Sequence, residues 1–342
     1  MAVSIRDVAD RAGVSVGTVS NVLNRPERVS EAVVQRVHDA IRELGYVRND
    51  AARQLRAGRS SSVGLVVLDA RNPFFTDIAR GAEDAAAEHG VAVLLGDSDE
   101  KPEREAAYLD LFEEQRVRGV LVSPLGDLRE RLARLRALGT PVVLVDRKAE
   151  DGEISSVAVD DVAGGRTAVA HLLERGRRRI AFVGGPLGLR QVADRLAGAR
   201  EAVSEVPGAA IEVLDAAALS VLEGRRMGEE LAARPASARP DAVFAANDLL
   251  AVGLLQALVM RGDVRVPQDV AIVGFDDIDF ASAAVVPLTS IRQPSRLIGQ
   301  TALRILLEEA DDPELPPRQL VFQPELVVRE STAGPSSGRM ST

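Results

Sequence analysis

The stretch SIRDVADRAGVSVGTVSNVLN, residues 4–24, decides how the beginning of this chain folds. Ser4 is followed three residues later by Asp7, a capping pattern in which a hydroxyl and a carboxylate satisfy free N–H groups at a helix start. Apolar residues then recur at helical spacing until the glycine of the stretch. The pattern predicts a first helix over about residues 5–12.

The second half of the stretch predicts another helix, over about residues 16–24. Gly13 permits the positive φ of a tight turn, and Ser15 is a suitable N-cap for the helix that follows it. Ala9 is small enough to let two helices approach closely, and Val19 would fill their interface. This spacing is typical of a helix-turn-helix unit.

A third helix is expected between Ser30, as its N-cap, and Gly45, as its end. Its apolar stripe consists of Val33, Val34, Val37, Ile41 and Leu44. In a helix-turn-helix unit the start of the second helix enters the major groove and its side chains reach bases and phosphates. The side chains that we expect at DNA are Ser4, Ser15, Val16, Gly17, Thr18, Ser20, Asn21 and Asn24. The alternative is a small three-helix packing module.

Residues 49–58, NDAARQLRAG, have the pattern of a miniature helix with Asn49 as N-cap and Gly58 as its end. A helix of about eight residues is marginal in water by itself. The serine-containing segment after it is typical of a flexible joint. We therefore expect this helix to become ordered on contact with DNA; the alternative is a plain linker.

These motifs resemble the head of the LacI-type (lactose-repressor) family of bacterial transcriptional regulators. The resemblance is carried by residues 5–9 (IRDVA), 12–15 (AGVS), 18–20 (TVS), 22–24 (VLN), 29–30 (VS) and 44–46 (LGY), and it extends to about residue 330. It implies a hinge helix in the minor groove, with Leu55 wedged between bases. The hinge residues that it places at DNA are Asn49, Ala52, Arg53, Leu55 and Arg56. Arg48 departs from the family, which usually has proline there.

The composition excludes several classes of protein. The 342 residues contain no cysteine and only three histidines, so neither disulfides nor a metal site is expected. No apolar run approaches a membrane span, and the N-terminus lacks a signal core, so we expect a cytoplasmic protein without membrane contact. Residues 1–60 carry a net charge of +3 and the remainder −12. Such asymmetry is expected when one end of a chain meets a polyanion.

No catalytic constellation is expected. Asp276 and Asp277 are adjacent, and neighbouring side chains on an extended chain face opposite ways. Residues 184–188, GGPLG, lack the lysine and the spacing of a phosphate-binding loop. The sequence therefore predicts neither an enzyme nor a protein that requires a cofactor.

Beyond residue 62, short β-rich runs alternate with helical stretches, the rhythm of buried parallel strands joined by crossover helices. The predicted strands are 63–68, 91–95, 119–123, 142–145, 156–159, 180–184, 211–214, 242–245, 270–274 and 289–292. Ten strands are too many for one small sheet. We therefore predict a multi-domain chain, with a small all-α helix-turn-helix head and an α/β body of two doubly wound parallel-sheet lobes.

The predicted division has four parts. They are the helix-turn-helix domain 1–47, the hinge helix and linker 48–61, the two-lobed body 62–330 and a flexible tail 331–342. The first lobe would hold about 62–161 and 293–322, and the second about 162–292 and 323–330.

Polar and aromatic side chains follow the predicted strands, at the edge where such sheets bind ligands. Carboxylates, amides and guanidinium groups pair with adjacent hydroxyls, and aromatic rings cover the apolar face of a sugar. Any single Asp or Asn could instead be a helix N-cap. The resemblance implies a body similar to periplasmic sugar-binding proteins, with effector contacts from Asn72, Phe74, Phe75, Asp146, Gln191, Arg195, Leu219, Asn247, Asp276 and Gln293. Leu219 stands where many relatives have an aromatic platform, which favours a small monosaccharide.

The sequence thus predicts a repressor of sugar-utilisation genes that a small sugar or sugar derivative releases from a pseudopalindromic operator. A homodimer is expected, because one helix-turn-helix unit reads only half of such a site. The alternatives are a regulator of the same family that needs a co-repressor, such as a nucleobase or a partner protein, and a sugar-binding transport protein. The sequence leaves open the effector, the sign of its action and the target genes.

Overall fold

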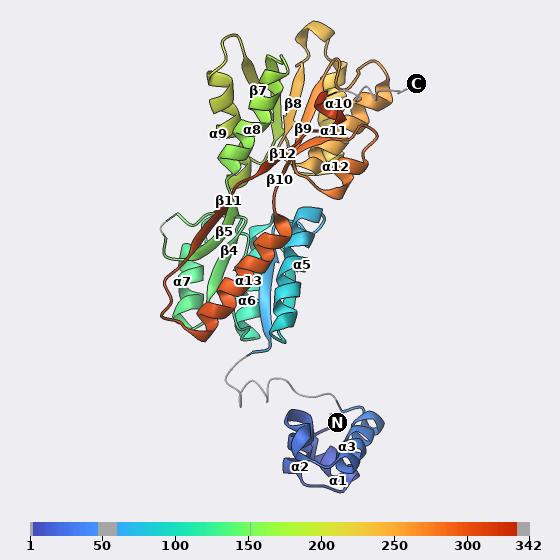
Figure 1. Ribbon diagram of the computed structural model, residues 1–342, viewed down its shortest axis with the longest axis vertical. Coiled ribbons are helices and arrows are strands. Elements are labelled where there is room, and N and C mark those ends of the chain that lie inside the picture. The colour runs from blue at the N-terminus through green and yellow to red at the C-terminus, as the bar shows by residue number, and fades with distance from the viewer. Residues whose placement is uncertain (1–2, 47–59, 151, 334–342) are drawn as a thin grey trace, which may run out of the picture. The chain divides into compact units, whose positions relative to one another are not determined.

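The computed structural model describes residues 3–46, 60–150 and 152–333 (Figure 1). The chain divides into a head that ends at Arg59 and a body that begins at Ser60, and each is described by itself. Within the described ranges no helix is both long enough and apolar enough to cross a bilayer.

The head has the predicted three helices. They are α1 (Ile5–Ala12), α2 (Val16–Asn24) and α3 (Glu31–Leu44), with a 3-10 turn η1 (Pro26–Arg28) before α3. Ser4 and Asp7 form a capping box, in which the backbone N–H of Ser4 donates to a carboxylate oxygen of Asp7 over 2.7 Å. Gly13 ends α1 in the left-handed conformation, at φ 65°. The boundaries of all three helices are confirmed.

A compact apolar cluster holds the three head helices together. Its buried members include Val8, Ala9, Val19, Val22 and Val37. Val19 is fully buried and Ala9 nearly so, as the spacing predicted for the contact between the first two helices. Ser30 has the extended backbone of an N-cap, but its side chain makes no capping hydrogen bond. Ser30 therefore occupies the N-cap position as predicted, but it does not make the capping hydrogen bond that was expected.

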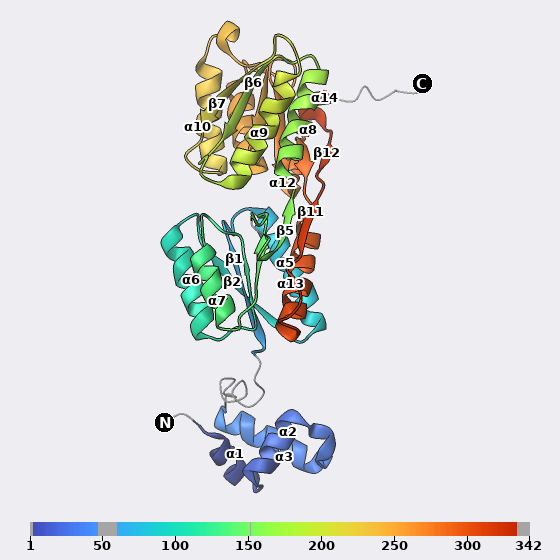
Figure 2. The same cartoon turned by 90° about the vertical axis from the view of Figure 1, so that its left-hand side faces the viewer.

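The body contains two six-stranded sheets (Figures 1 and 2). The first has the order β11-β5-β4-β3-β1-β2 and the second β12-β10-β9-β8-β6-β7. The strands are β1 (Ser62–Val67), β2 (Ala92–Asp97), β3 (Val120–Val122), β4 (Val142–Val145), β5 (Ser155–Val159), β6 (Arg179–Gly184), β7 (Ala210–Asp215), β8 (Ala242–Ala245), β9 (Ala271–Asp276), β10 (Thr289–Arg292), β11 (Gln319–Phe322) and β12 (Glu325–Val327). Among the strands that the structure describes, β12 alone pairs antiparallel, so parallel strands dominate both sheets.

Helices cover both faces of each sheet, as in the predicted doubly wound architecture (Figures 1 and 2). They are α5 (Pro73–Glu88), α6 (Pro102–Glu114), α7 (Arg129–Ala137), α8 (Asp161–Glu174), α9 (Arg190–Ser204), α10 (Val221–Ala233), η2 (Ala236–Ala238), α11 (Asp248–Arg261), α12 (Asp279–Ala283), α13 (Ser295–Asp311) and α14 (Glu330–Ala333). Each sheet with its helices forms one lobe of the body.

The chain passes between the lobes three times, from β5 to α8, from β10 to α13 and from β11 to β12. The returning helix α13 packs on α5 and contacts β3, β4 and β5. A Cβ atom on Gly299 of α13 would lie 1.9 Å from the carbonyl oxygen of Ile78 on α5. Glycine is therefore required for the close approach that attaches this late segment to the first lobe.

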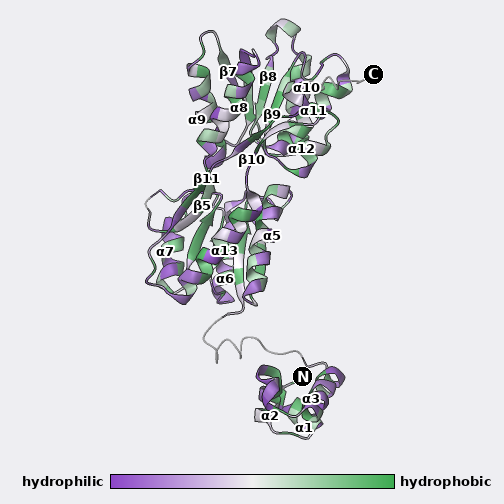
Figure 3. Cartoon of the chain, in the orientation of Figure 1, coloured by the Kyte–Doolittle hydropathy of each residue, from purple (hydrophilic) through white to green (hydrophobic). Residues whose placement is uncertain are grey.

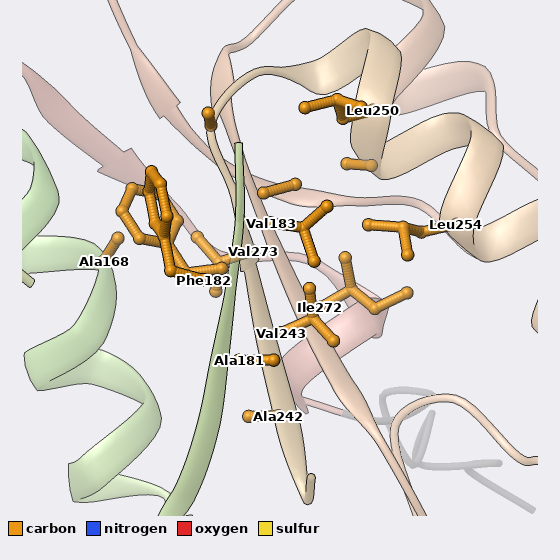
Figure 4. Close-up of a cluster of buried hydrophobic side chains, with 14 of the residues drawn as sticks. Ala168, Ala181, Phe182, Val183, Ala242, Val243, Leu250, Leu254, Ile272 and Val273 are labelled. Carbon is orange, nitrogen blue, oxygen red and sulfur yellow. The ribbon is translucent and has the colours of Figure 1, made fainter. Parts of the chain in front are cut away.

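Apolar side chains fill the space between sheets and helices, and Figure 3 shows the most hydrophobic residues on the strands. In the second lobe, Phe182 of β6 lies on the α8 side of the sheet beside Ala168, whereas Val183 lies on the α11 side near Leu250 and Leu254 (Figure 4). The alternation along one strand buries both faces. The sequence of a strand buried on both faces is a continuous apolar run, and this pattern allowed most of the strands to be predicted.

The end of the body differs from the prediction in two strands that were missed and in the first residues of the tail; the rest of the predicted tail, 334–342, lies outside the described residues. The strands β11 and β12 were not predicted, because they are short and largely exposed. The flexible tail was expected from residue 331, but Ser331 and Thr332 are buried in the second lobe. The hydroxyl of Ser331 accepts from the N–H of Thr289 over 2.8 Å and donates to the carbonyl of Ile272 over 2.6 Å. These hydrogen bonds anchor the segment.

Candidate functional site

The predicted DNA contacts of the head lie on α2, on its N-cap Ser15 and on Ser4, the N-cap of α1. Ser4, Ser15, Val16, Gly17, Asn21 and Asn24 are exposed, and Thr18 and Ser20 are half-buried. The hydroxyl of Ser15 accepts the N–H of Thr18 over 3.0 Å, so it caps the helix. Val16 is 39% exposed, an apolar side chain at the tip of the helix where a thymine methyl would be reached. The residues predicted for the hinge helix, Asn49, Ala52, Arg53, Leu55 and Arg56, lie outside the described residues.

A cavity lies between the two lobes of the body, with about 450 Å³ of empty space when the part open to solvent is included. It is lined by Leu68, Asp69, Asn72, Phe74, Phe75, Glu100, Asp146, Leu189, Gln191, Val192, Arg195, Leu219, Asn247 and Asp276. Nine of the ten side chains that were predicted for the effector site are in this set. The tenth, Gln293, does not line the cavity; its side-chain amide donates to a carboxylate oxygen of Asp276 over 2.8 Å.

The ends of strands and the starts of helices position the first-lobe side chains. Asn72 caps α5 by accepting the N–H of Phe74 over 3.1 Å, and its amide group donates across to Asp276 in the second lobe over 3.0 Å. The rings of Phe74 and Phe75 meet edge to face, with centroids 5.0 Å apart. The asparagine is therefore both a helix cap and a contact between the lobes.

A second contact between the lobes joins Gln191 of α9 to Asp146, which follows β4. The amide nitrogen of Gln191 donates to the backbone carbonyl of Asp146 over 2.8 Å and to its carboxylate over 3.0 Å. Asp146 and Asp276 both adopt a positive φ, 57° and 109°. Such strained backbone at two non-glycine residues is characteristic of functional sites.

One buried guanidinium, that of Arg195 on α9, lies among the carboxylates of the cavity. Its Nε donates to Asp161 over 2.7 Å, and its Nη1 donates to the carbonyl of Ala246 over 2.8 Å. The distance from Nη1 to the nearer carboxylate oxygen of Asp276 is 3.9 Å. The guanidinium also stacks 3.7 Å from the ring centre of Phe275. We predicted hydroxyl contacts for Arg195, and the structure adds that Arg195 organises the surrounding carboxylates.

Burial dominates the electrostatics of this cluster. It raises the pKa of Asp146 well above the usual value, the pKa of Asp161 to about 6, and the pKa of Asp276. Burial also disfavours the charge of Arg195, but the carboxylates of Asp161, Asp276 and Asp146 outweigh it and raise the pKa of Arg195. Perturbed groups gathered in one cavity are typical of a binding site.

Two side chains that line the cavity have buried oxygen atoms without a hydrogen-bond partner in the described structure. They are Oδ1 of Asp146 and Oε1 of Gln191. A buried polar atom that stays unpaired costs about 1–3 kcal/mol. Both atoms accept hydrogen bonds, so a ligand with several donor groups would satisfy them.

Sequence reasoning missed five residues of the cavity wall. They are Leu68, Asp69, Glu100, Leu189 and Val192. Asp69 directly follows the first strand, so the rule that ligands bind at strand ends could have found it. Glu100 lies in a turn after β2 that contains no glycine, and no sequence signal marks it. Leu219 contributes an aliphatic wall, and its carbonyl accepts the side-chain amide of Asn247 over 3.2 Å.

Comparison with known proteins accords with both parts of the chain. A model described as bacterial regulatory proteins, lacI family, matches residues 4–49, and a model of a periplasmic binding protein-like domain matches residues 169–332. The ribose operon repressor of Halalkalibacterium halodurans is 36% identical over 335 residues, which cover 97% of each chain.

Two solved structures extend the comparison. A lac repressor dimer bound to operator and the anti-inducer ONPF is 28% identical, with a TM-score of 0.80 and coverage of 97% of this chain and 99% of that chain. A LacI family transcriptional regulator from Enterococcus faecium with bound ribose is 30% identical, with a TM-score of 0.72 and coverage of 80% of this chain and 99% of the other.

A helix-turn-helix head on a two-lobed body with an interlobe cavity defines a class, that of DNA-binding regulators whose bodies are built like periplasmic binding proteins. Within that class, this chain belongs to the LacI family of bacterial regulatory proteins. Both the resemblance and the predicted function class, a DNA-binding transcriptional regulator, are thereby confirmed.

Proposed function

We propose that this regulator represses sugar-utilisation genes from a pseudopalindromic operator, and that a small sugar in the interlobe cavity releases it. The observation that carries the proposal is the pair of buried acceptor atoms on Asp146 and Gln191, which lack donors in the described structure. Sugar hydroxyls supply such donors. The rings of Phe74 and Phe75 offer an apolar wall beside them.

The names of relatives support a sugar as the effector. One relative is a ribose operon repressor, and one solved relative contains bound ribose. Leu219 supports a small ligand, because an aliphatic side chain cannot stack on a purine or a second sugar ring as an aromatic one would. Leu219→Trp is expected to shift preference toward larger or aromatic ligands in a binding panel. An unchanged ranking would contradict this role.

The mechanism that we propose is linkage between the cavity and DNA. The lobes are joined by the hydrogen bonds from Asn72 to Asp276 and from Gln191 to Asp146. A ligand that bonds to these same groups changes the relative energy of lobe arrangements. A typical coupling is about 1–3 kcal/mol, or roughly 5- to 150-fold in DNA affinity. The hinge helix that would transmit this change lies outside the described residues and stays a prediction.

A homodimer would present two heads to the two halves of the operator. The edge strand β2 carries exposed Leu94 and Leu95, at 38% and 46%, and Leu111 of α6 is 43% exposed. Exposed apolar side chains on an unpaired sheet edge favour association with another chain. We propose a second copy of this chain as the occupant, because a solved relative is a dimer bound to operator. The site of action is the cytoplasm, where the DNA is.

The test is a titration of purified protein onto its own upstream intergenic DNA, followed by pentoses, hexoses and their phosphates. Salt-sensitive binding to a pseudopalindrome that one sugar abolishes is the expected result. Binding that a ligand tightens would instead indicate a co-repressor. The absence of specific DNA binding would overturn the proposal and favour a plain sugar-binding protein.

A further inference from the structure

The turn between β2 and α6 brings an acidic side chain to the cavity in a fixed position. Asp99 and Glu100 are consecutive residues in the left-handed region, with φ of 51° and 54°. The carboxylate of Asp97 accepts the N–H groups of Ala70 and Asp99 over 3.2 and 3.1 Å. The N–H of Glu100 donates to the carbonyl of Leu68 over 3.0 Å. A backbone strained at two residues and tied on both sides holds Glu100 at the cavity wall.

The cations near this wall are engaged by the neighbouring Asp99. Its carboxylate lies 2.8 Å from Arg71, 2.6 Å from Lys101 and 3.2 Å from Arg104. In the part of the chain that the structure describes, Glu100 forms no ion pair. Arg71 also donates to Asp69 of the cavity wall over 2.8 Å. Among the described residues, the turn therefore gives cations to Asp99 and Asp69 and leaves Glu100 without one at ion-pair distance.

The charged side chains that line the cavity are four carboxyl groups and one guanidinium, namely Asp69, Glu100, Asp146, Asp276 and Arg195. The guanidinium of Arg195 is already paired with Asp161 behind the cavity wall. Helix α9 also begins at this wall, and a helix N-terminus offers about half a positive charge. Asp69 is likewise paired with Arg71. Among the described residues that line the cavity, no cation is left unpaired to neutralise an anionic ligand, and Glu100 adds a carboxyl group without an ion-pair partner.

We propose that Glu100 acts as a charge filter that admits uncharged polyhydroxylated ligands and excludes phosphorylated ones. The inference rests on the proposed function, because it concerns the ligand of the same cavity. A phosphate monoester carries nearly two negative charges at neutral pH. Its burial beside the carboxyl group of Glu100, without an unpaired cation, combines a desolvation penalty with like-charge repulsion. A sugar without the phosphate has no charge, so its binding involves neither this desolvation penalty nor this repulsion.

Isothermal titration of the full-length protein with D-ribose and D-ribose 5-phosphate, and with D-glucose and D-glucose 6-phosphate, tests the filter. We expect the phosphate ester of whichever sugar binds to be weaker by about 100-fold or more. In Glu100→Gln the gap is expected to shrink by about tenfold, because one like charge is removed. Glu103→Gln is the matched control, since Glu103 is exposed on α6 and does not line the cavity.

Circular dichroism melts of both variants separate a changed filter from a damaged fold. A phosphate ester that binds as tightly as its parent sugar would overturn the filter. So would an equal change of the gap in Glu100→Gln and Glu103→Gln. If neither sugar binds in either form, the proposed sugar effector fails instead. The filter is then decided by adenine against adenosine 5′-monophosphate, where the nucleotide is again expected to be excluded.

Discussion

Replacement of Arg195 by methionine probes the electrostatic centre of the body. Methionine keeps most of the length of the side chain but removes its charge. The guanidinium is about 5% exposed, pairs with Asp161 at 2.7 Å and faces Asp276 at 3.9 Å. In Arg195→Met, at least two buried carboxyl groups lose their cation. They must then either stay charged in a poorly solvated site or take up protons.

The expected loss of unfolding free energy is large. Removal of one partner from a buried ion pair costs about 3–5 kcal/mol. For a body of this size, that corresponds to a fall of roughly 6–20 °C in Tm. The loss is expected to be smaller at pH 5 than at pH 8, because burial already raises the pKa of Asp161 to about 6 and its protonated form is accessible. Urea unfolding followed by circular dichroism at both pH values measures these effects.

The matched control is Arg190→Met on the same helix. Arg190 is about half exposed and pairs with Asp194 at 2.9 Å, four residues later. An exposed pair of this kind contributes about 0.3–0.5 kcal/mol. If Arg195→Met proves no more destabilising than Arg190→Met, the view of Arg195 as the organiser of the buried carboxylates is wrong.

Three further outcomes are expected. Ser15→Ala removes the cap of α2, so the head should lose about 1 kcal/mol and operator binding should weaken in a DNA titration, whereas the body melts unchanged. Leu95→Asp charges the apolar β2 edge and should shift sedimentation from dimer to monomer; a persistent dimer would exclude that edge. The pKa of Asp161 is raised above its unfolded value, so its carboxyl destabilises the body as pH rises from about 4 to beyond 6. Asp161→Asn lacks this titration but also loses the ion pair with Arg195. The free energy of unfolding of the variant minus that of the unmodified protein should therefore rise by on the order of 1 kcal/mol from pH 5 to pH 8, whatever its sign; parallel pH curves would refute this.

The sequence predicted the head and most of the strands because local signals determine them. Ser4, Gly13 and Ser15 stop and start helices within a few residues, so the ends of α1 and α2 were found to the residue. The strands β11 and β12 are only four and three residues long, no residue of either is fully buried, and pairing with β5 and β10 makes them strands. Such pairing depends on contacts distant in sequence, which a local pattern does not contain.

Cavity residues that directly follow strands could be predicted from the sequence. Residues that reach the cavity through packing between distant segments were harder to predict. Asn72, Asp146 and Asp276 follow or end strands, and all three line the cavity. Two relations could not be predicted. Asp161 pairs with Arg195 across two helices, and Glu100 depends on a left-handed turn without glycine. Both are set by tertiary structure, which overrides the local preference of these residues.

The chain crosses between the lobes three times, so the order of synthesis determines which parts of the protein can fold first. The head is continuous in sequence and is synthesised before either lobe, so it can fold during synthesis. The first lobe cannot finish at that stage. Its core includes Ile298, Leu303 and Leu306 of α13, and its sheet ends in β11, segments that are synthesised after most of the second lobe. A ribosome that stalls before α13 would therefore release a chain with a finished DNA reader and an open apolar face on its body. Such a fragment is a natural target for chaperones and proteases.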